Sequence, residues 1–327
     1  MIRRLALGAL LGALTVLPAL TQSAGAQPAW PDRPIRLVVP FGAGGPSDIV
    51  ARILVPKISA TLGQPVVVDN RAGAGGVTGV NVIARADPDG YVFGMGSAGG
   101  LAISPGLDRG TPYNPLTDLA PLTLGVLVPE PLVVPVAAGF QTIQELIAAA
   151  KARPGALNFG STGSGSMPHL AAEQLRAAAG LDIVHISYRS GGALSTAILT
   201  NEVQLGFADL PVLLGHIRGG TMRALAVGTA ERLSWIPDVP TMREVGLPSV
   251  DASNWHGFVA PARTPEPILA ALHSAVAGAL NDPDIRRQLD GQGAIPGGNS
   301  RAEFGAFMRS ELEKWGAVIR ANNITAE

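Results

Sequence analysis

An apolar, β-branched segment, a glycine-rich loop and a helical pattern follow one another twice in this chain. In the first case residues 35–39 predict a strand, and after the loop apolar side chains recur at spacings of mostly three and four from about Ser47 to residue 62. In the second case a strand at 157–160 leads into a loop at 161–166 and a helix that opens near Met167 or Pro168. Alternating strands and helices are typical of βαβ units. The sequence therefore predicts an α/β protein with mainly parallel sheets.

The rest of the chain continues this alternation. Further strands are expected at 65–69, 91–95, 183–186, 203–207, 224–227 and 255–259, and further helices at 77–86, 142–152, 192–199, 267–280 and 301–320. Pro56 falls inside the first helix and is expected to kink it or to start a new turn, because proline lacks the backbone donor. Residues 96–100 include three glycines and are expected to form a loose loop.

The chain is long enough for two lobes. Its 327 residues exceed one ordinary core, and 47% of them are hydrophobic, which is ample material to bury. Proline recurs every few residues from 112 to 135, as in extended chain that crosses between lobes, and the boundary is expected near Val128. A second proline-rich stretch precedes the strand at 255–259, which is expected to return to the first lobe. The prediction is a first lobe of residues 27–127 plus 252–327, a second lobe of residues 128–251, and a hinge with two crossings.

The N-terminus has the pattern of a secretory signal peptide. Arg3 and Arg4 form a positive region, residues 5–20 a short apolar segment, and residues 24–26 a small-residue cleavage site. The alternative is a membrane anchor, but the apolar segment is shorter than the ~20 residues that span a bilayer. We expect cleavage after Ala26 and export to the periplasm. The chain contains no cysteine, which excludes lipid attachment through cysteine, disulfides and thiolate metal sites.

Charge and motifs argue against several function classes. Basic and acidic residues number 24 and 25, so no net field attracts nucleic acid. The five histidines are scattered, with no pair at the spacing of a helical zinc motif, no serine lies in a G-x-S-x-G elbow, and no Gly-Lys pair supports a P-loop. Residues 94–99 fit G-x-G-x-x-G, but prolines downstream break the helix that a nucleotide site would need. No catalytic residue, metal or cofactor is predicted.

The two glycine loops predict anion sites. A strand, a short glycine and serine loop and a helix bring free backbone N–H groups and the positive end of the helix dipole to one point. Such a point occurs once in each expected lobe, so the pair can clamp a small anion. The alternative is that the glycines only make tight turns and that Ser47, Asp48 or Ser166 only caps a helix. We interpret Asp48 as a cap, because a carboxylate would repel an anion.

Asp209 follows the strand at 203–207, at a strand end where ligands collect. It is expected either to bind an ammonium or hydroxyl of the ligand or to cap the turn before Pro211. The candidate ligand-binding residues are Phe41, Gly42, Ala43, Gly44, Gly45, Ser47, Ser97, Ser161, Thr162, Gly163, Ser164, Ser166 and Asp209.

Several stretches, in a fixed order along the chain, carry a family resemblance: 30–41 with the loop that follows, 70–76, 88–91, 160–170, Tyr188, 216–227, 239–241 and 255–261. Through them the sequence, from Trp30 to about Asn323, resembles the Bug family of periplasmic substrate-binding proteins of tripartite tricarboxylate transporters. Two positions depart from the family pattern. Residues 97–101 lack a histidine common there, and Arg189 and Ser190 stand where lysine and glycine are usual. These departures concern the identity of the ligand.

The resemblance implies a type II periplasmic-binding-protein fold, in which two α/β lobes close over a ligand. It further implies that the loops matching Gly42 to Ser47 and Ser161 to Ser166 hold a ligand carboxylate, partly through ordered water, and that the position matching Asp209 meets the ligand's far end. The expected function is that of a monomeric solute-binding protein that delivers a small organic carboxylate to integral membrane transporter subunits. Two alternatives stay open: a sensor that reports to a signalling protein, and an exported hydrolase using Ser161 or Ser164 with His169.

Overall fold

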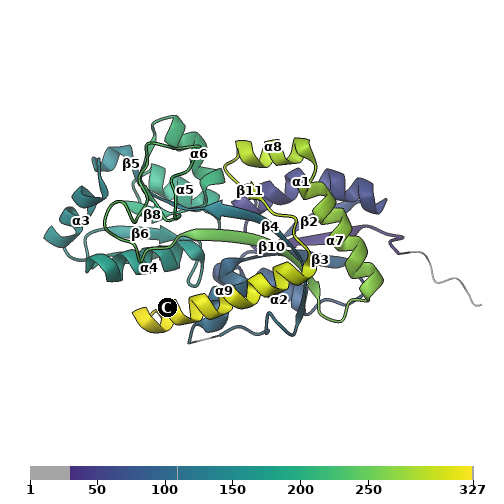
Figure 1. Ribbon diagram of the computed structural model, residues 1–327. Helices are drawn as coiled ribbons and strands as arrows, with labels where there is room; N and C mark the ends of the chain where they lie inside the picture. The colour runs from purple at the N-terminus through teal and green to yellow at the C-terminus, as the bar shows by residue number, and fades with distance from the viewer. Residues whose placement is uncertain (1–29, 109, 326–327) are drawn as a thin grey trace, which may run out of the picture.

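The computed structural model describes residues 30–108 and 110–325, so the expected signal peptide lies outside the described residues. Figure 1 shows two groups of strands flanked by helices, joined by two long strands that lie side by side. In the described part of the chain no helix is long and apolar enough to cross a bilayer.

The first sheet has the order β11-β4-β10-β3-β1-β2. Its strands are β1 (Ile35–Val39), β2 (Val66–Asn70), β3 (Val92–Ser97), β4 (Leu119–Pro129), β10 (Ser253–Pro261) and β11 (Ile295–Pro296). Its helices are α1 (Pro46–Leu62), α2 (Val77–Ala84), α7 (Glu266–Leu280), α8 (Pro283–Gly291) and α9 (Arg301–Asn322). One core lies between this sheet and α1 and α7, and another lies between its opposite face and α2 and α9.

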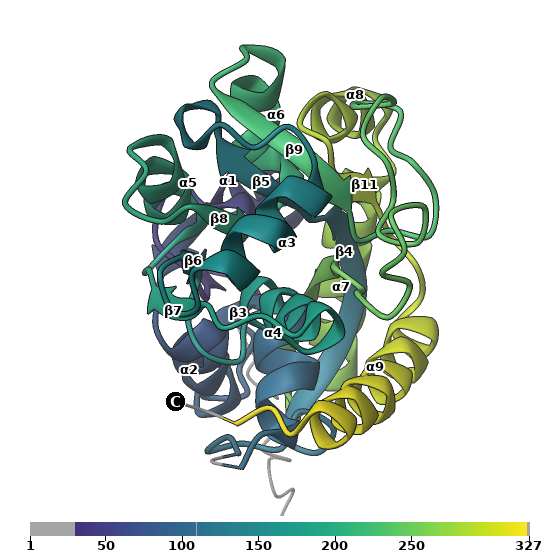
Figure 2. The ribbon, with the colours of Figure 1, turned by 90° about the vertical axis from the view of Figure 1, so that its left-hand side faces the viewer.

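The second sheet has the order β7-β6-β8-β5-β9. Its strands are β5 (Pro131–Pro135), β6 (Asn158–Ser161), β7 (Val184–Ser187), β8 (Leu205–Phe207) and β9 (Met222–Val227). Its helices are α3 (Ile143–Ala152), α4 (Met167–Ala179), α5 (Gly191–Leu199) and α6 (Leu210–Arg218). Figure 2 looks onto this end of the molecule, with α3 and α4 in front of the sheet. The core beneath α3 and α4 and the core beneath α5 lie on opposite faces.

The chain changes sheets twice, and the two changes meet. β4 ends at Pro129 and β5 begins at Pro131, so Glu130 stands between the sheets. The Glu130 N–H donates to the carbonyl of Ala252, just before β10, at 3.0 Å. We propose the lobe boundaries at these two positions, close to those expected from the sequence. Lobe 1 then contains the first sheet and lobe 2 the second.

The prediction of mainly parallel sheets was wrong, because the sheets are mixed. β1 pairs parallel with β2 and β3, and β6 pairs parallel with β7 and β8. β10 runs antiparallel to β3 and β4, and β5 runs antiparallel to β8 and β9. A strand that carries the chain into a lobe, or back from the other lobe, enters from the hinge without a crossover helix. It therefore joins its sheet in the opposite direction.

Three local predictions also need correction. α1 continues through Pro56, so no new turn starts there, whereas the expected kink stays a prediction; the Pro56 side chain is exposed, so water can satisfy the carbonyl that proline leaves without a donor. Residues 96–100 were expected to form a loose loop, but β3 continues to Ser97 and two short helical turns follow, η2 (Gly99–Ile103) and η3 (Ser104–Gly106). α6 and α8 were not predicted, since prolines within their first turns resemble loop signals although proline is compatible with the start of a helix.

Candidate ligand-binding site

A small cavity lies where the two lobes meet. Lobe 1 contributes residues from the loop after β1 and from the end of β3, and lobe 2 contributes residues from the loops after β6, β7 and β8. The lining residues are Phe41, Pro46, Ser97, Thr162, Ser166, Met167, Pro168, Gly191, Ala208, Asp209 and Asn254. Five of these were predicted from the sequence: Phe41, Ser97, Thr162, Ser166 and Asp209.

Helix N-termini surround this cavity. Pro46 is the first residue of α1, Met167 the first of α4 and Gly191 the first of α5, and Asp209 immediately precedes α6. Each helix start carries free N–H groups and a partial positive charge. Among the described residues that line the cavity there is no lysine or arginine, and Asp209 alone is charged. The positive potential in the cavity therefore comes from the backbone, which suits a small anion.

The side chain of Asp48 fixes the loop after β1 by hydrogen bonds. The Asp48 carboxylate accepts hydrogen bonds from Gly44 N at 2.9 Å, from Arg52 Nε at 2.9 Å and from Asn70 Nδ2 at 3.1 Å. Although burial opposes ionisation, these donors hold the pKa of Asp48 below its usual value. Asp48 lies in the first turn of α1, where Gly45 is the N-cap and no side chain caps. Asp48 therefore fixes the loop from the first turn, and its expected role as a cap is only partly matched.

The loop after β6 is fixed by serine and histidine side chains. Ser166 caps α4 by accepting the His169 N–H at 3.4 Å, and His169 Nδ1 accepts the Gly165 N–H at 3.3 Å. Ser161 is fully buried, with Oγ 2.6 Å from His185 Nε2, and it accepts the Gly163 N–H at 3.1 Å. Ser161 does not line the cavity and shapes the loop from within.

Three loop glycines, Gly42, Gly75 and Gly163, lie where the lobes touch. A Cβ on Gly75 would stand 2.7 Å from Ser164 O, and one on Gly163 would stand 2.8 Å from Gly75 N. At the other side of the cavity, a Cβ on Gly42 would lie 3.2 Å from Ser190 Cβ. The lobes are therefore closed against each other through backbone contacts, and glycine is required there because a side chain would hold the lobes apart.

Eight predicted residues do not line the cavity: Gly42, Ala43, Gly44, Gly45, Ser47, Ser161, Gly163 and Ser164. Ser47 is buried, and its Oγ lies 3.4 Å from His256 Nε2 on β10. Ser97 does reach the cavity, and its buried Oγ has no hydrogen-bond partner among the described residues, so it is available to a ligand. For all thirteen candidate residues, direct contact with a ligand remains a prediction.

Asp209 does not cap α6 with its side chain. Its Oδ1 accepts a hydrogen bond from Asn254 Nδ2 at 2.8 Å, and its Oδ2 lies 3.5 Å from His256 Nε2. Sequence reasoning missed Asn254 because it comes from β10, 45 residues away, and nothing in its own neighbourhood marks it. Pro46, Met167, Pro168 and Gly191 could have been found, since each lies at a predicted helix start.

The model of the family described as "Tripartite tricarboxylate transporter family receptor" matches residues 50–324 of this chain. The chain belongs to this family. The resemblance seen in the sequence is thereby confirmed, as is the two-lobed periplasmic-binding-protein fold. Within the family, the periplasmic binding protein BugD is 31% identical, with a TM-score of 0.86 over 91% of this chain and 100% of that one.

Two receptor structures from Rhodopseudomonas palustris contain a bound acid. MatC (Rpa3494) with malate is 30% identical, with a TM-score of 0.85 over 89% of this chain and 100% of that one. Rpa4515 with adipate is 31% identical, with a TM-score of 0.86 over 90% of this chain and 99% of that one. Both bound molecules are dicarboxylic acids, and at this similarity the whole two-lobed frame is shared.

Proposed function

We propose that this receptor captures one small organic carboxylate between its lobes in the periplasm and delivers it to the membrane subunits of a tripartite tricarboxylate-type transporter. The observation that carries the proposal is the lining of the cavity. Four helices start at its wall, and none of the described residues that line it is a lysine or an arginine. The malate and adipate complexes of related receptors support it. Residues from both lobes form the cavity, so closure buries the ligand.

The lining of the cavity favours binding of an acid over its chemical conversion. The hydrolase alternative would use Ser161 or Ser164 with His169, but neither serine lines the cavity, and Ser161 is buried within its loop. The cavity offers backbone dipoles, single hydroxyls and one carboxylate, which can hold an acid in place. We propose that the protein has no catalytic activity and works as a monomer. Incubation with esters of candidate acids, followed by chromatography, should return the esters unchanged.

A thermal-shift panel tests the capture of acids. Ligand-free protein is mixed with C3 to C8 mono-, di- and tricarboxylates, aromatic acids and amino acids, and each acid is paired with its amide. We expect one chemical group of acids to stabilise the fold by about 2.7 kcal/mol at a hundredfold excess over Kd, and the amides to have no effect. A flat response to every acid, with the protein shown by mass spectrometry to be ligand-free, would contradict the proposal.

Export and partner are tested separately. N-terminal sequencing of the periplasmic protein should begin at Gln27 if cleavage follows Ala26. Cross-linking of the ligand-loaded receptor in cells should capture transporter membrane subunits. Capture of a signalling protein in their place would favour the sensor alternative.

A further inference from the structure

Behind the cavity a buried polar cluster joins the hinge to the ligand site. We call Glu130, Asp209, Asn254 and His256 the hinge cluster. Glu130 stands between the two sheets and is completely buried, and Asp209 is 7% exposed at the cavity wall. The Asn254 amide donates both to Glu130 Oε1 at 3.1 Å and to Asp209 Oδ1 at 2.8 Å. Two carboxyl groups from different parts of the chain therefore share one amide group in a buried position.

No positive charge in the cluster balances two carboxylates. His256 is the remaining titratable member, and burial lowers its pKa although Asp209 opposes this, so it is neutral at neutral pH. Its Nε2 lies between Asp209 Oδ2, at 3.5 Å, and Ser47 Oγ on α1, at 3.4 Å. The cluster thus offers the carboxyl pair neutral hydrogen-bond groups only.

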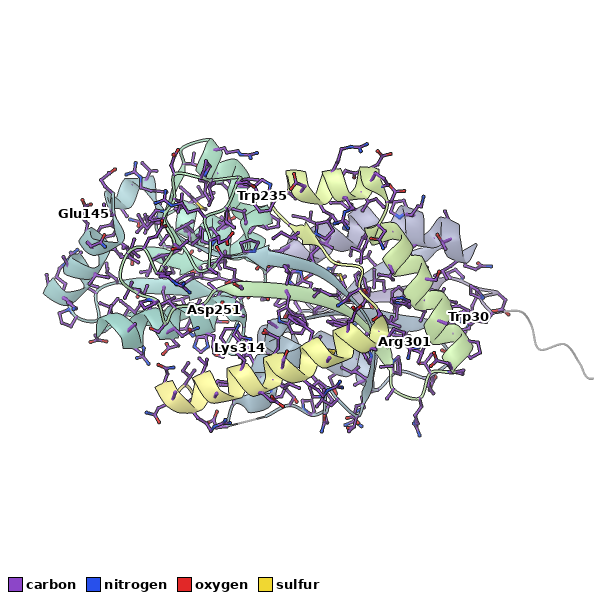
Figure 3. All side chains as sticks on the ribbon, viewed as in Figure 1. Trp30, Glu145, Trp235, Asp251, Arg301 and Lys314 are labelled. Carbon is purple, nitrogen blue, oxygen red and sulfur yellow. The ribbon has the colours of Figure 1, made fainter. Side chains whose placement is uncertain are left out.

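The surroundings add a further negative charge. Asp251, in the loop before β10, repels a charge on Glu130. Lys314 of α9 pairs with Asp251 at 2.7 Å, and its Nζ lies 3.6 Å from Glu311 (Figure 3). Its charge is therefore already engaged by acidic groups on the outer side of the cluster. Two adjacent buried carboxyls without a cation do not both ionise, so the pair retains one proton.

Burial and the unpartnered Oε2 favour the neutral form of Glu130. Burial, and after it the charge of Asp209, raises the pKa of Glu130 well above its usual value. Glu130 Oε2 is buried with no hydrogen-bond partner among the described residues, which costs far less on a neutral carboxyl than on an anion. Asp209 instead accepts a hydrogen bond at Oδ1, has His256 Nε2 3.5 Å from its Oδ2, and faces the cavity.

We propose that Glu130 stays protonated so that Asp209 alone carries the charge and accepts a hydrogen bond from the far end of the bound acid. This rests on the proposed function and narrows the ligand class. The ligand's second polar group is a donor: an ammonium, a hydroxyl or a protonated carboxyl. A diacid that is doubly ionised in solution therefore binds with uptake of about one proton. Glu130 is a positioning residue, since it acts through Asn254 and Asp209.

A matched series of ligands tests the far end. Titration calorimetry compares butyrate, 4-hydroxybutyrate, 4-aminobutyrate and succinate, together with their six-carbon counterparts, in buffers of different ionisation enthalpy. At the chain length that binds, we expect the hydroxy or amino acid to bind at least tenfold more tightly than the plain acid. The diacid should take up about one proton. In Asp209→Asn the advantage of the donor and the proton uptake should both vanish. Equal binding of plain and donor-bearing acids, or an unchanged series in Asp209→Asn, would overturn the proposal.

A second measurement tests the proton on Glu130 without any ligand. A group whose pKa is raised in the folded state stabilises the fold fully below its ordinary pKa, and that contribution is lost as pH rises through the raised pKa. Urea unfolding of the wild type from pH 5 to 9 should show this loss. Glu130→Gln keeps an acceptor for Asn254 and should remove the loss, whereas the control Asp251→Asn should leave most of it.

The two measurements separate the two proposals. If Glu130→Gln keeps the wild-type dependence of unfolding on pH, the proposal that Glu130 is protonated is wrong, whether or not an acid binds. If Glu130→Gln removes the dependence but no acid binds the wild type, the proposed function fails while the retained proton stands. If the wild type binds an acid and Glu130 is protonated, the affinity of the wild type for that acid should fall at high pH, and the affinity of Glu130→Gln should not.

Discussion

Replacement of Gly75 by alanine is expected to weaken ligand binding about a hundredfold and to leave the protein folded. Gly75 lies in the helical turn η1 (Ala74–Gly76) of lobe 1, and an added Cβ would stand 2.7 Å from Ser164 O and 3.0 Å from Ser166 N of lobe 2. These are backbone atoms of a loop that is fixed by its own hydrogen bonds, so they cannot move aside cheaply. Overpacking of this kind costs roughly 1–3 kcal/mol, and the upper part of that range corresponds to about a hundredfold in Kd.

A matched control removes the effect of backbone strain. Gly75 has φ +61°, a region that alanine disfavours, so the variant also loses stability for a reason unrelated to closure. Gly63 has φ +70°, lies at the end of α1, and has nothing within 4 Å of an added Cβ. Calorimetry and thermal unfolding of both variants should show a similar loss of stability but a loss of affinity in Gly75→Ala alone. Equal affinities would mean that contact between the lobes does not limit binding.

The second large effect concerns α9 and the packing of lobe 1. Glu311 is 8% exposed, and its Oε2 accepts hydrogen bonds from Trp255 Nε1 at 2.8 Å and from Trp315 Nε1 at 2.9 Å. Glu311→Ala leaves two buried indole N–H groups without an acceptor. Since each such group costs roughly 1–3 kcal/mol, we expect the free energy of unfolding to fall by about 3 kcal/mol in urea titrations.

An exposed glutamate of the same helix serves as the control for Glu311. Glu303 forms the capping box of α9 with Ser300 and lies at the surface. Glu303→Ala should cost only about 1 kcal/mol, since it removes a cap and no buried partner. Similar losses in the two variants would show that the indole contacts contribute little. Because Trp255 lies on β10, next to Asn254, Glu311 also supports the strand that leads to the hinge cluster.

The sequence predicted the fold well wherever a pattern is local. The strand at 35–39, the helix end at Gly63 and the loop at 161–166 each depend on residues within a few positions, and all three are observed. Strand direction was predicted less well. Whether β10 joins its sheet parallel or antiparallel depends on where the chain comes from, and that is fixed by the hinge.

The site was predicted only in part, for a related physical reason. Phe41, Thr162 and Ser166 belong to recognisable loops, whereas the contact between Asn254 and Glu130 joins residues 124 positions apart. One local signal for Glu130 existed. It is the only charged residue between Leu119 and Pro135, in a stretch that is otherwise apolar or small. A lone acid in a crossing between lobes is worth reading as a buried functional group.

The glycines acquire a second role from the structure. From the sequence the loop glycines were expected to form anion sites or tight turns. The contacts of Gly42, Gly75 and Gly163 add that they allow the lobes to close on each other. One composition therefore serves both the anion site and the closure that buries the anion.

The mass of the receptor isolated from the periplasm tests whether the protein captures an organic acid. Native mass spectrometry, compared with the denatured mass, should show a single added molecule of one small organic acid, and that acid should rebind to the emptied protein one to one. A receptor that carries no acid, and that after unfolding and refolding binds none of the acids extracted from the same cells, would show that the cavity does not capture acids.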